Sequence, residues 1–156
     1  MAYREYGGDY PTVQTNKTHE SAGSEPIKVK ASDIMSTKPI CTHADSPVMD
    51  AVKQLEKNRI SGMPVVDDNG CLTGIISEKD TFKLMLQGKF TQALAGKVGD
   101  YMSEDVETVH PDDDLFKIAN LFYSKSFRRL PVIEDRKVVG LISRRDVLRS
   151  LNSMGN

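Results

Sequence analysis

The sequence predicts an α/β (α+β) fold made of two tandem repeats of β-α-β-β-α type, with sheets packed on helices. Two pairs of segments support this. The segment GIISEKD at 74–80 recurs as GLISRRD at 140–146, and MPVV at 63–66 recurs in the same order as LPVI at 130–133. A shorter echo, DIMS at 33–36 and DYMS at 100–103, precedes each. Such a duplication indicates two copies of one supersecondary unit.

The 156 residues suit one module in which two halves share a core, because repeats of about 60 residues are marginal alone. We place the first repeat at 27–88, a linker at 89–96 and the second repeat at 97–152. Residues 1–26 are polar, interrupted by glycine and proline, and lack apolar periodicity. We expect them to form a flexible N-terminal tail.

In the first repeat, Ser46 and Pro47 are expected to start a helix whose apolar face carries Val48, Ala51 and Leu55. Strands at 63–66 and 72–76 follow, joined by a DDNG turn at 67–70 that suits a hairpin. Ser77 then starts a second helix as its N-cap.

The second repeat keeps the same order. Asp114 precedes a helix with apolar Leu115 and Ile118, the strand at 130–133 leads to a second strand, and Ser143 starts the last helix. Between the repeats, the sequence predicts a short helical piece at 90–94.

Composition excludes several classes of function. A net charge of -1 gives no reason to expect nucleic acid or an anionic membrane as a partner. The absence of a long apolar run or a secretory signal makes a cytoplasmic protein the expectation. Two cysteines form neither a disulfide framework nor a zinc site, and no nucleophile with a positioned base can be assembled, so we expect no enzyme.

The two Gly-apolar-apolar-Ser-x-x-Asp segments and the two apolar-Pro-Val-apolar strands resemble a pair of cystathionine-β-synthase (CBS) domains, also called a Bateman module. The resemblance covers about residues 28–152. It implies halves related by pseudo-twofold symmetry, with two clefts that bind adenine nucleotides or other adenosyl ligands in many relatives. It also implies a regulatory module that commonly forms flat dimers.

The Ser-x-x-Asp motif has two interpretations. Ser77 with Asp80, and Ser143 with Asp146, fit a capping box that needs no ligand. Alternatively, the carboxylate at the first helical turn accepts hydrogen bonds from a ribose diol, and the helix N-terminus suits a phosphate. The resemblance favours ribose binding by both aspartates.

Basic residues lie near the second motif. Arg144 and Arg145 occupy a first helical turn, where the macrodipole disfavours cations by about 0.3–1 kcal/mol each, and an anion would resolve this conflict. Arg128 and Arg129 stand where relatives reach phosphates. A solvated basic face is the alternative. The first repeat offers only Lys79, so we expect unequal clefts, with phosphate held more tightly in the Asp146 cleft.

By the same resemblance, Ile60, Ser61 and Gly62 are expected to line the adenine end of the Asp146 cleft. Gly62 would admit a flat ring there, or would serve only as a strand entry with unusual backbone angles. His43 and His110 hold equivalent positions in the two repeats, but two histidines without carboxylate or thiol partners are too few ligands for a metal ion. We therefore expect no metal site.

The function expected is the sensing of AMP, ADP or ATP by a module that modulates a separate regulated protein, of unknown identity, or its own assembly. No catalytic cofactor is expected. S-adenosylmethionine or NAD is the alternative ligand, and an unliganded dimerisation scaffold is the alternative function. The apolar stripes of four helices exceed what one module can cover, so we expect a homodimer.

Overall fold

The computed structural model describes residues 27–87 and 95–156 of the chain. The tail predicted at 1–26 and the helical piece predicted at 90–94 lie outside the described residues. In the described part of the chain, no helix is both long enough and apolar enough to cross a membrane.

The first repeat contains a helix, a hairpin and a second helix. These are α2 (Val48–Asn58), β1 (Gly62–Val66), β2 (Leu72–Ser77) and α3 (Glu78–Leu86). The strands run antiparallel, with Gly62 opposite Ser77. Asp67 Oδ1 accepts hydrogen bonds from the backbone N–H groups of Asn69 and Cys71, and Gly70 adopts a φ of 79°, so the expected tight turn forms.

The second repeat has the same order of elements. They are α5 (Leu115–Ser124), β3 (Arg129–Glu134), β4 (Lys137–Ser143) and α6 (Arg144–Met154). Arg129 lies opposite Ser143 in the antiparallel pair, as Gly62 does to Ser77 in the first repeat. The predicted fold class and the duplication of the unit are therefore confirmed.

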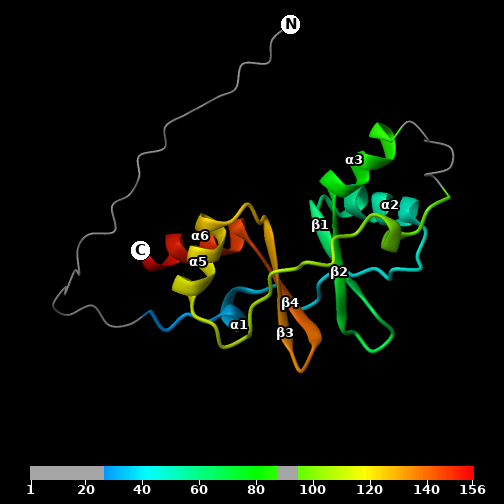
Figure 1. Cartoon of the computed structure of the whole chain (residues 1–156). Helices are drawn as coiled ribbons and strands as arrows, with labels where there is room; N and C mark the ends of the chain where they lie inside the picture. The colour runs from blue at the N-terminus through cyan, green and yellow to red at the C-terminus, as the bar shows by residue number, and fades with distance from the viewer. Residues whose placement is uncertain (1–26, 88–94) are drawn as a thin grey trace, which may run out of the picture.

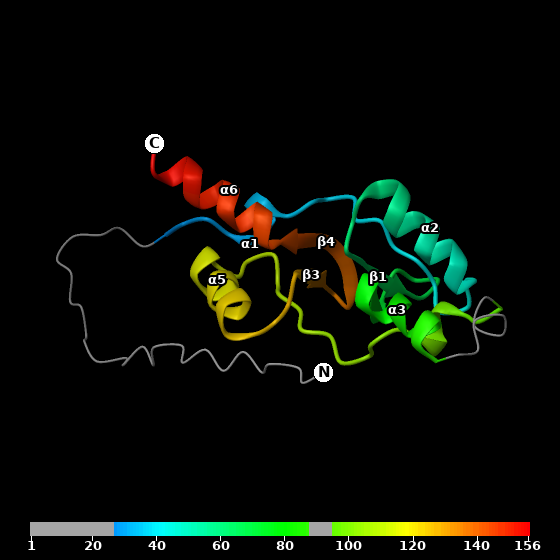
Figure 2. The ribbon, with the colours of Figure 1, turned by 90° about the horizontal axis from the view of Figure 1, so that it is seen from above.

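The two hairpins lie side by side in the middle of the molecule, each with its own pair of helices (Figures 1 and 2). Their turns meet at one end. Cys71 forms an antiparallel bridge with Lys137, and the N–H of Val138 donates a 3.1 Å hydrogen bond to the carbonyl of Gly70. The described halves are therefore joined through backbone hydrogen bonds between their hairpin ends.

Each repeat also receives the segment that precedes the other repeat's hairpin. The short helix α1 (Ala31–Ile34) packs in the core of the second repeat, and the 3₁₀ helix η1 (Val98–Asp100) packs in that of the first. Ser36 exchanges two backbone hydrogen bonds with Leu141 of β4, at 2.9 and 3.1 Å. Ser103 does the same with Ile75 of β2, at 2.9 Å each. Because of this exchange, neither half can complete its core alone.

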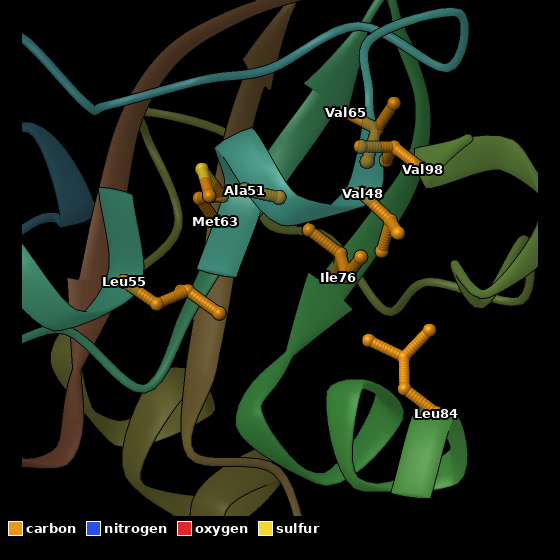
Figure 3. Packing of buried hydrophobic residues seen from close by; sticks show 8 residues of the cluster. All are labelled: Val48, Ala51, Leu55, Met63, Val65, Ile76, Leu84 and Val98. Carbon is orange, nitrogen blue, oxygen red and sulfur yellow. The ribbon is translucent and has the colours of Figure 1, made fainter. Parts of the chain in front are cut away.

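The core of the first repeat shows the exchange directly. Figure 3 shows eight buried side chains, with Val98 of η1 packed among residues of α2, β1 and β2. These are Val48, Ala51, Leu55, Met63, Val65, Ile76, Leu84 and Val98. A matching cluster in the second repeat includes Ala31 of α1, which is fully buried.

Three predictions of local structure differ from what is observed. Ser46 is not an N-cap, because α2 begins after Pro47 without a side-chain capping bond. The first strand expected in each repeat is a single bridged residue: Thr42 pairs with Val65 in one, and Val109 with Val132 in the other. These positions lie at the edges of the hairpins, where one backbone pairing suffices to place the chain.

Candidate functional site

Both Ser-x-x-Asp motifs form capping boxes. In α3, the N–H and Oγ of Ser77 each donate to Asp80 Oδ2 at 2.9 Å, and the Asp80 N–H donates back to Ser77 Oγ at 3.4 Å. In α6, Ser143 and Asp146 repeat the arrangement at 2.7, 2.9 and 3.3 Å. The capping interpretation is therefore correct for both motifs.

Capping leaves one oxygen of each carboxylate with spare acceptor capacity. Asp80 Oδ1 lies 3.5 Å from Lys83 Nζ, and Asp146 Oδ1 lies 3.6 Å from an Arg149 guanidinium nitrogen. These separations are too long for strong charge-assisted hydrogen bonds. Each Oδ1 can therefore still accept a hydrogen bond from a hydroxyl group.

A pocket of about 420 Å³ opens between the repeats in front of α3. This volume falls in the range of roughly 300–1,000 Å³ typical of small-molecule sites. The first repeat contributes seven residues, Ser61, Gly62, Ile75, Ser77, Glu78, Lys79 and Phe82. The second contributes four consecutive residues, Ser126, Phe127, Arg128 and Arg129.

Gly62 lines the pocket at a position where a side chain has little room. A Cβ at Gly62 would lie 3.2 Å from the carbonyl oxygen of Ile76 and 3.6 Å from Ser77. The glycine is buried and has an ordinary strand pairing, without a positive φ. The close approach of β2 therefore explains this glycine, and unusual backbone angles do not.

Arg129 connects the two repeats at the pocket lining. Its Nε donates a 3.0 Å hydrogen bond to Ser61 Oγ, which is 68 positions away in the sequence. Burial lowers the pKa of the Arg129 guanidinium below its ordinary value, while the carboxylates of Asp146 and Glu78 act in the opposite direction. The half-buried cation therefore interacts with carboxylates from both repeats.

The charge of the pocket favours an anion. Lys79, Arg128 and Arg129 bring three cations to its lining, and Glu78 brings one carboxylate. The start of α3 adds the positive end of a helix dipole. Two backbone donors of that first turn are already used: the N–H of Glu78 donates to the carbonyl of Ser61 at 2.9 Å, and the N–H of Asp80 donates to Ser77 Oγ at 3.4 Å.

The remaining predicted residues lie elsewhere. Asp146 lines a separate hollow of about 340 Å³ beside α1, together with Asp33 and Arg149. Arg144 donates from Nε to the carbonyl of Phe127 at 2.9 Å, and Arg145 is exposed. The buried Asp80 supports the α3 cap, while Ile60 packs against the first core.

The grouping of the arginines therefore differs from the prediction. The sequence assigns four arginines to the Asp146 cleft, whereas Arg128 and Arg129 line the pocket in front of α3. The backbone path explains this. Both residues directly follow 126–127, and these four consecutive residues line the same pocket as Ser61 and Lys79 of the first repeat.

Sequence reasoning missed the aromatic part of the pocket. Phe82 is an apolar residue of the helix predicted to start at Ser77, but it is 57% exposed and lines the pocket. The sequence does carry a signal for Phe127, because it occupies the position in the second repeat that the predicted site residue Ile60 occupies in the first. Glu78 is the counterpart of Arg144 and reverses the charge at that position.

The histidines have local roles or none that the structure shows. His110 Nδ1 accepts a 3.1 Å hydrogen bond from the N–H of Asp112, and His43 is exposed. Among residues 27–87 and 95–156, no three histidine, cysteine, aspartate or glutamate side chains gather as metal ligands would.

Curated relatives share the duplicated unit. The chain is 33% identical over 146 residues to L-aspartate semialdehyde sulfurtransferase of Methanocaldococcus jannaschii, covering 91% of this chain and 28% of that protein. It is 32% identical to the mitochondrial CBS domain-containing protein CBSX3 of Arabidopsis thaliana, covering 85% and 68%. The chain thus spans about a quarter of the sulfurtransferase and about two thirds of CBSX3.

Solved structures show the same fold. CBSX2 of Arabidopsis thaliana in complex with AMP superposes with a TM-score of 0.74 at 29% identity, covering 82% of this chain and 99% of that one. The CBS domain pair of protein MJ0100, in complex with 5'-methylthioadenosine and S-adenosyl-L-methionine, gives 0.72 at 32%, covering 83% and 99%. The CBS domain model matches residues 31–87 and 98–153, so the chain belongs to the CBS domain family as a tandem pair.

Proposed function

We propose that the pocket in front of α3 binds an adenine nucleotide, AMP, ADP or ATP, and that the module thereby regulates a partner protein or its own assembly. The observation that carries this proposal is the convergence of Lys79, Arg128 and Arg129 on the start of α3. Guanidinium groups bind phosphate oxygens in a bidentate manner, and a helix N-terminus adds backbone donors.

The rest of the pocket suits the nucleoside. Phe82 and Phe127 offer aromatic surface for a flat base, and Gly62 contributes a part of the wall that carries no side chain. Asp80 lies in the first turn of α3, and its Oδ1, which the capping box does not use, is the acceptor that we assign to a ribose hydroxyl. Asp146 has the same free oxygen in its own hollow and is the ribose anchor of a second site.

Charge separates the possible adenosyl ligands. Relatives with this fold bind AMP in one case and 5'-methylthioadenosine with S-adenosyl-L-methionine in another. S-adenosylmethionine carries a positive sulfonium, and methylthioadenosine carries no negative charge. Three cations against one carboxylate therefore favour a phosphorylated ligand over both, and NAD remains the larger phosphorylated alternative.

Titration calorimetry of the full chain with adenosine, AMP, ADP, ATP, S-adenosylmethionine and NAD tests the proposal. We expect AMP, ADP or ATP to bind at least about tenfold more tightly than adenosine, the scale of one charged hydrogen bond. Equal affinities for adenosine and AMP would mean that the arginines form only a solvated face. No binding of any of the six compounds would favour the scaffold function instead.

We also propose that two copies pair through the outer faces of α3 and α6. The same two positions of each helix expose apolar side chains: Phe82 and Met85 in α3 are 57% and 71% exposed, and Leu148 and Leu151 in α6 are 65% and 48% exposed. The duplication gives α3 and α6 equivalent apolar faces, and an isologous contact sets the same face of two identical copies against each other. A second copy is therefore the partner that this face fits.

A further inference from the structure

One side chain connects the starts of α3 and α6. The backbone of Arg129 lies opposite Ser143, the N-cap of α6, which holds Asp146 in its capping box. The side chain of Arg129 extends to Ser61 Oγ in the first repeat. The carbonyl of Ser61 in turn accepts the N–H of Glu78, the first residue of α3. This chain of contacts runs from one helix cap to the other through a single guanidinium group.

The connection has no symmetric counterpart. In the first repeat, Gly62 occupies the position of Arg129, opposite the N-cap Ser77, and has no side chain to reach the second repeat. The duplication that gives the two hairpins the same strand pairing is broken in its side chains at this pair. The link therefore depends on Arg129 alone, and it lies at the pocket that both Arg129 and Ser61 line.

We propose that Arg129 is an inter-repeat link that an anionic ligand releases, by taking the guanidinium group from Ser61. The inference rests on the proposed function and adds the means by which the pocket reports that it is occupied. A serine hydroxyl is a neutral acceptor of one hydrogen bond, whereas a phosphate accepts two charge-assisted bonds from the same guanidinium. The exchange is therefore favourable once a phosphate enters.

Release changes the contact between the repeats. Ser61 loses its hydrogen bond to Arg129 of β3, and the guanidinium group turns from Ser61 to the phosphate within the pocket that both residues line. The half-buried position of Arg129 favours this exchange of hydrogen-bond acceptors. Because burial penalises the charge of the guanidinium, a phosphate stabilises it more than a neutral hydroxyl does. The energy needed to break the bond to Ser61 is subtracted from the affinity of the wild type for the anion.

Removal of the competing hydroxyl should therefore improve binding, although Ser61 lines the pocket. We expect Ser61→Ala to bind AMP about threefold to tenfold more tightly than the wild type, the range of one hydrogen bond. Any change in the pocket wall acts on adenosine as well, and adenosine has no phosphate to recruit Arg129, so the gain is measured as the ratio of AMP affinity to adenosine affinity. In the Arg129→Lys background, which keeps the charge but loses the Nε donor, Ser61→Ala should have no effect on AMP.

The experiment is a calorimetric double-mutant cycle on the full chain, with AMP and adenosine as probes. Ser32→Ala, exposed on α1, is the matched control and should bind both as the wild type does. Thermal unfolding checks that each variant folds, and Ser61→Cys, a near-isosteric weak acceptor, replaces Ser61→Ala if that variant does not fold. The inference is overturned, while the proposed function stands, if neither Ser61 variant binds AMP more tightly than the wild type does. The same holds if adenosine binding tightens as much as AMP binding. If the wild type binds no AMP, the proposed function falls and the inference with it.

Discussion

Met35 packs its thioether directly against the backbone of Gly140 in the other repeat. A Cβ at Gly140 would overlap the side chain of Met35 and lie 2.9 Å from the carbonyl oxygen of Ser36. The duplicate of this contact joins Met102 to Gly74, where a Cβ would lie 2.8 Å from the sulfur. Neither glycine has a positive φ, so the duplicated motif begins with glycine because another chain segment crosses there.

Gly140→Ala should therefore destabilise the fold by about 1–3 kcal/mol, the usual cost of overpacking a core. Urea unfolding followed by circular dichroism measures the change. Adding Met35→Ala should recover part of the loss, since it removes the thioether but leaves the Ser36 carbonyl in place. Gly155→Ala, where the nearest atom lies 3.7 Å away, should change stability little. A full-sized loss in Gly155→Ala would show that the effect is not specific to the crossing.

Local hydrogen bonding explains which parts of the fold could be predicted. Ser77 and Ser143 are found as N-caps because a capping box depends only on residues three positions apart. The hairpins follow from the same kind of local signal at their turns. The exchange of α1 and η1 does not, because the repeated DIMS and DYMS segments indicate a duplication but carry no signal for which core they join.

The candidate site shows the same division. The residue types of the pocket are recognisable in the sequence, but their grouping depends on how far a side chain reaches across the repeats. Arg129 contacts Ser61 instead of gathering with Arg144, whose guanidinium is held by the Phe127 carbonyl. Phe82 follows the apolar pattern of α3, and periodicity alone cannot separate a pocket wall from a core contact.

Arg128→Ala should remove much of the preference for phosphorylated ligands. Arg128 lines the pocket and, in the described residues, no ion pair or side-chain hydrogen bond holds it, so its loss costs the fold little. We expect AMP affinity to fall about tenfold, with adenosine unchanged, in calorimetric titrations. Lys53→Ala, on the exposed face of α2, is the charge-matched control. A larger loss in Arg145→Ala than in Arg128→Ala would place the phosphate at α6, as the sequence predicts.

Asp80→Ala and Asp146→Ala should separate capping from ligand binding. Both substitutions remove a capping box and should each destabilise the protein by about 1 kcal/mol in thermal or urea unfolding. Each variant should also lose affinity for adenosine in its own site, Asp80→Ala in the α3 pocket and Asp146→Ala in the hollow beside α1. We expect Asp80→Ala to weaken binding in the α3 pocket by about 1.5–3 kcal/mol. Stability losses with unchanged affinity in both variants would leave the aspartates as caps alone.

Asp113 should make stability sensitive to acid. Burial opposes its ionisation, but hydrogen bonds from Lys117 Nζ and the His110 N–H, at 2.8 Å each, outweigh that effect and lower the pKa of Asp113. Its contribution is thus fully present above the unfolded value of about 3.9 and is lost as the pH falls through the lowered folded value. Asp113→Asn should cost about 1 kcal/mol at pH 7 and progressively less below pH 4. Urea unfolding at several pH values measures this, with the exposed Asp68→Asn as control. A cost that does not change with pH would contradict it.

Charge placed on the outer faces of α3 and α6 should separate the two copies. Phe82 also lines the ligand pocket, so the cleaner substitutions are Met85→Glu and Leu151→Glu, which stand at equivalent positions of the two helices. Burying either carboxylate against an apolar partner face is costly, and an isologous contact repeats the cost in both copies. We expect the wild type to be a dimer at micromolar concentration and the double variant to be a monomer, measured by light scattering across a dilution series.

If the interface is as proposed, the dimer should dissociate only when the new charge lies on the apolar faces of α3 and α6, and not when it lies elsewhere on the chain. Lys57→Glu, at the exposed end of α2, changes the charge of the chain in the same direction without touching the apolar faces, and should leave the dimer intact. Met85→Glu and Leu151→Glu should each keep the stability of the wild-type monomer, because these two side chains are exposed and contribute little to either core. A wild type that stays monomeric with and without AMP would reject the proposed dimer. A dimer that survives Met85→Glu and Leu151→Glu together would place the contact on other faces, and the duplicated apolar pairs would then need a different partner.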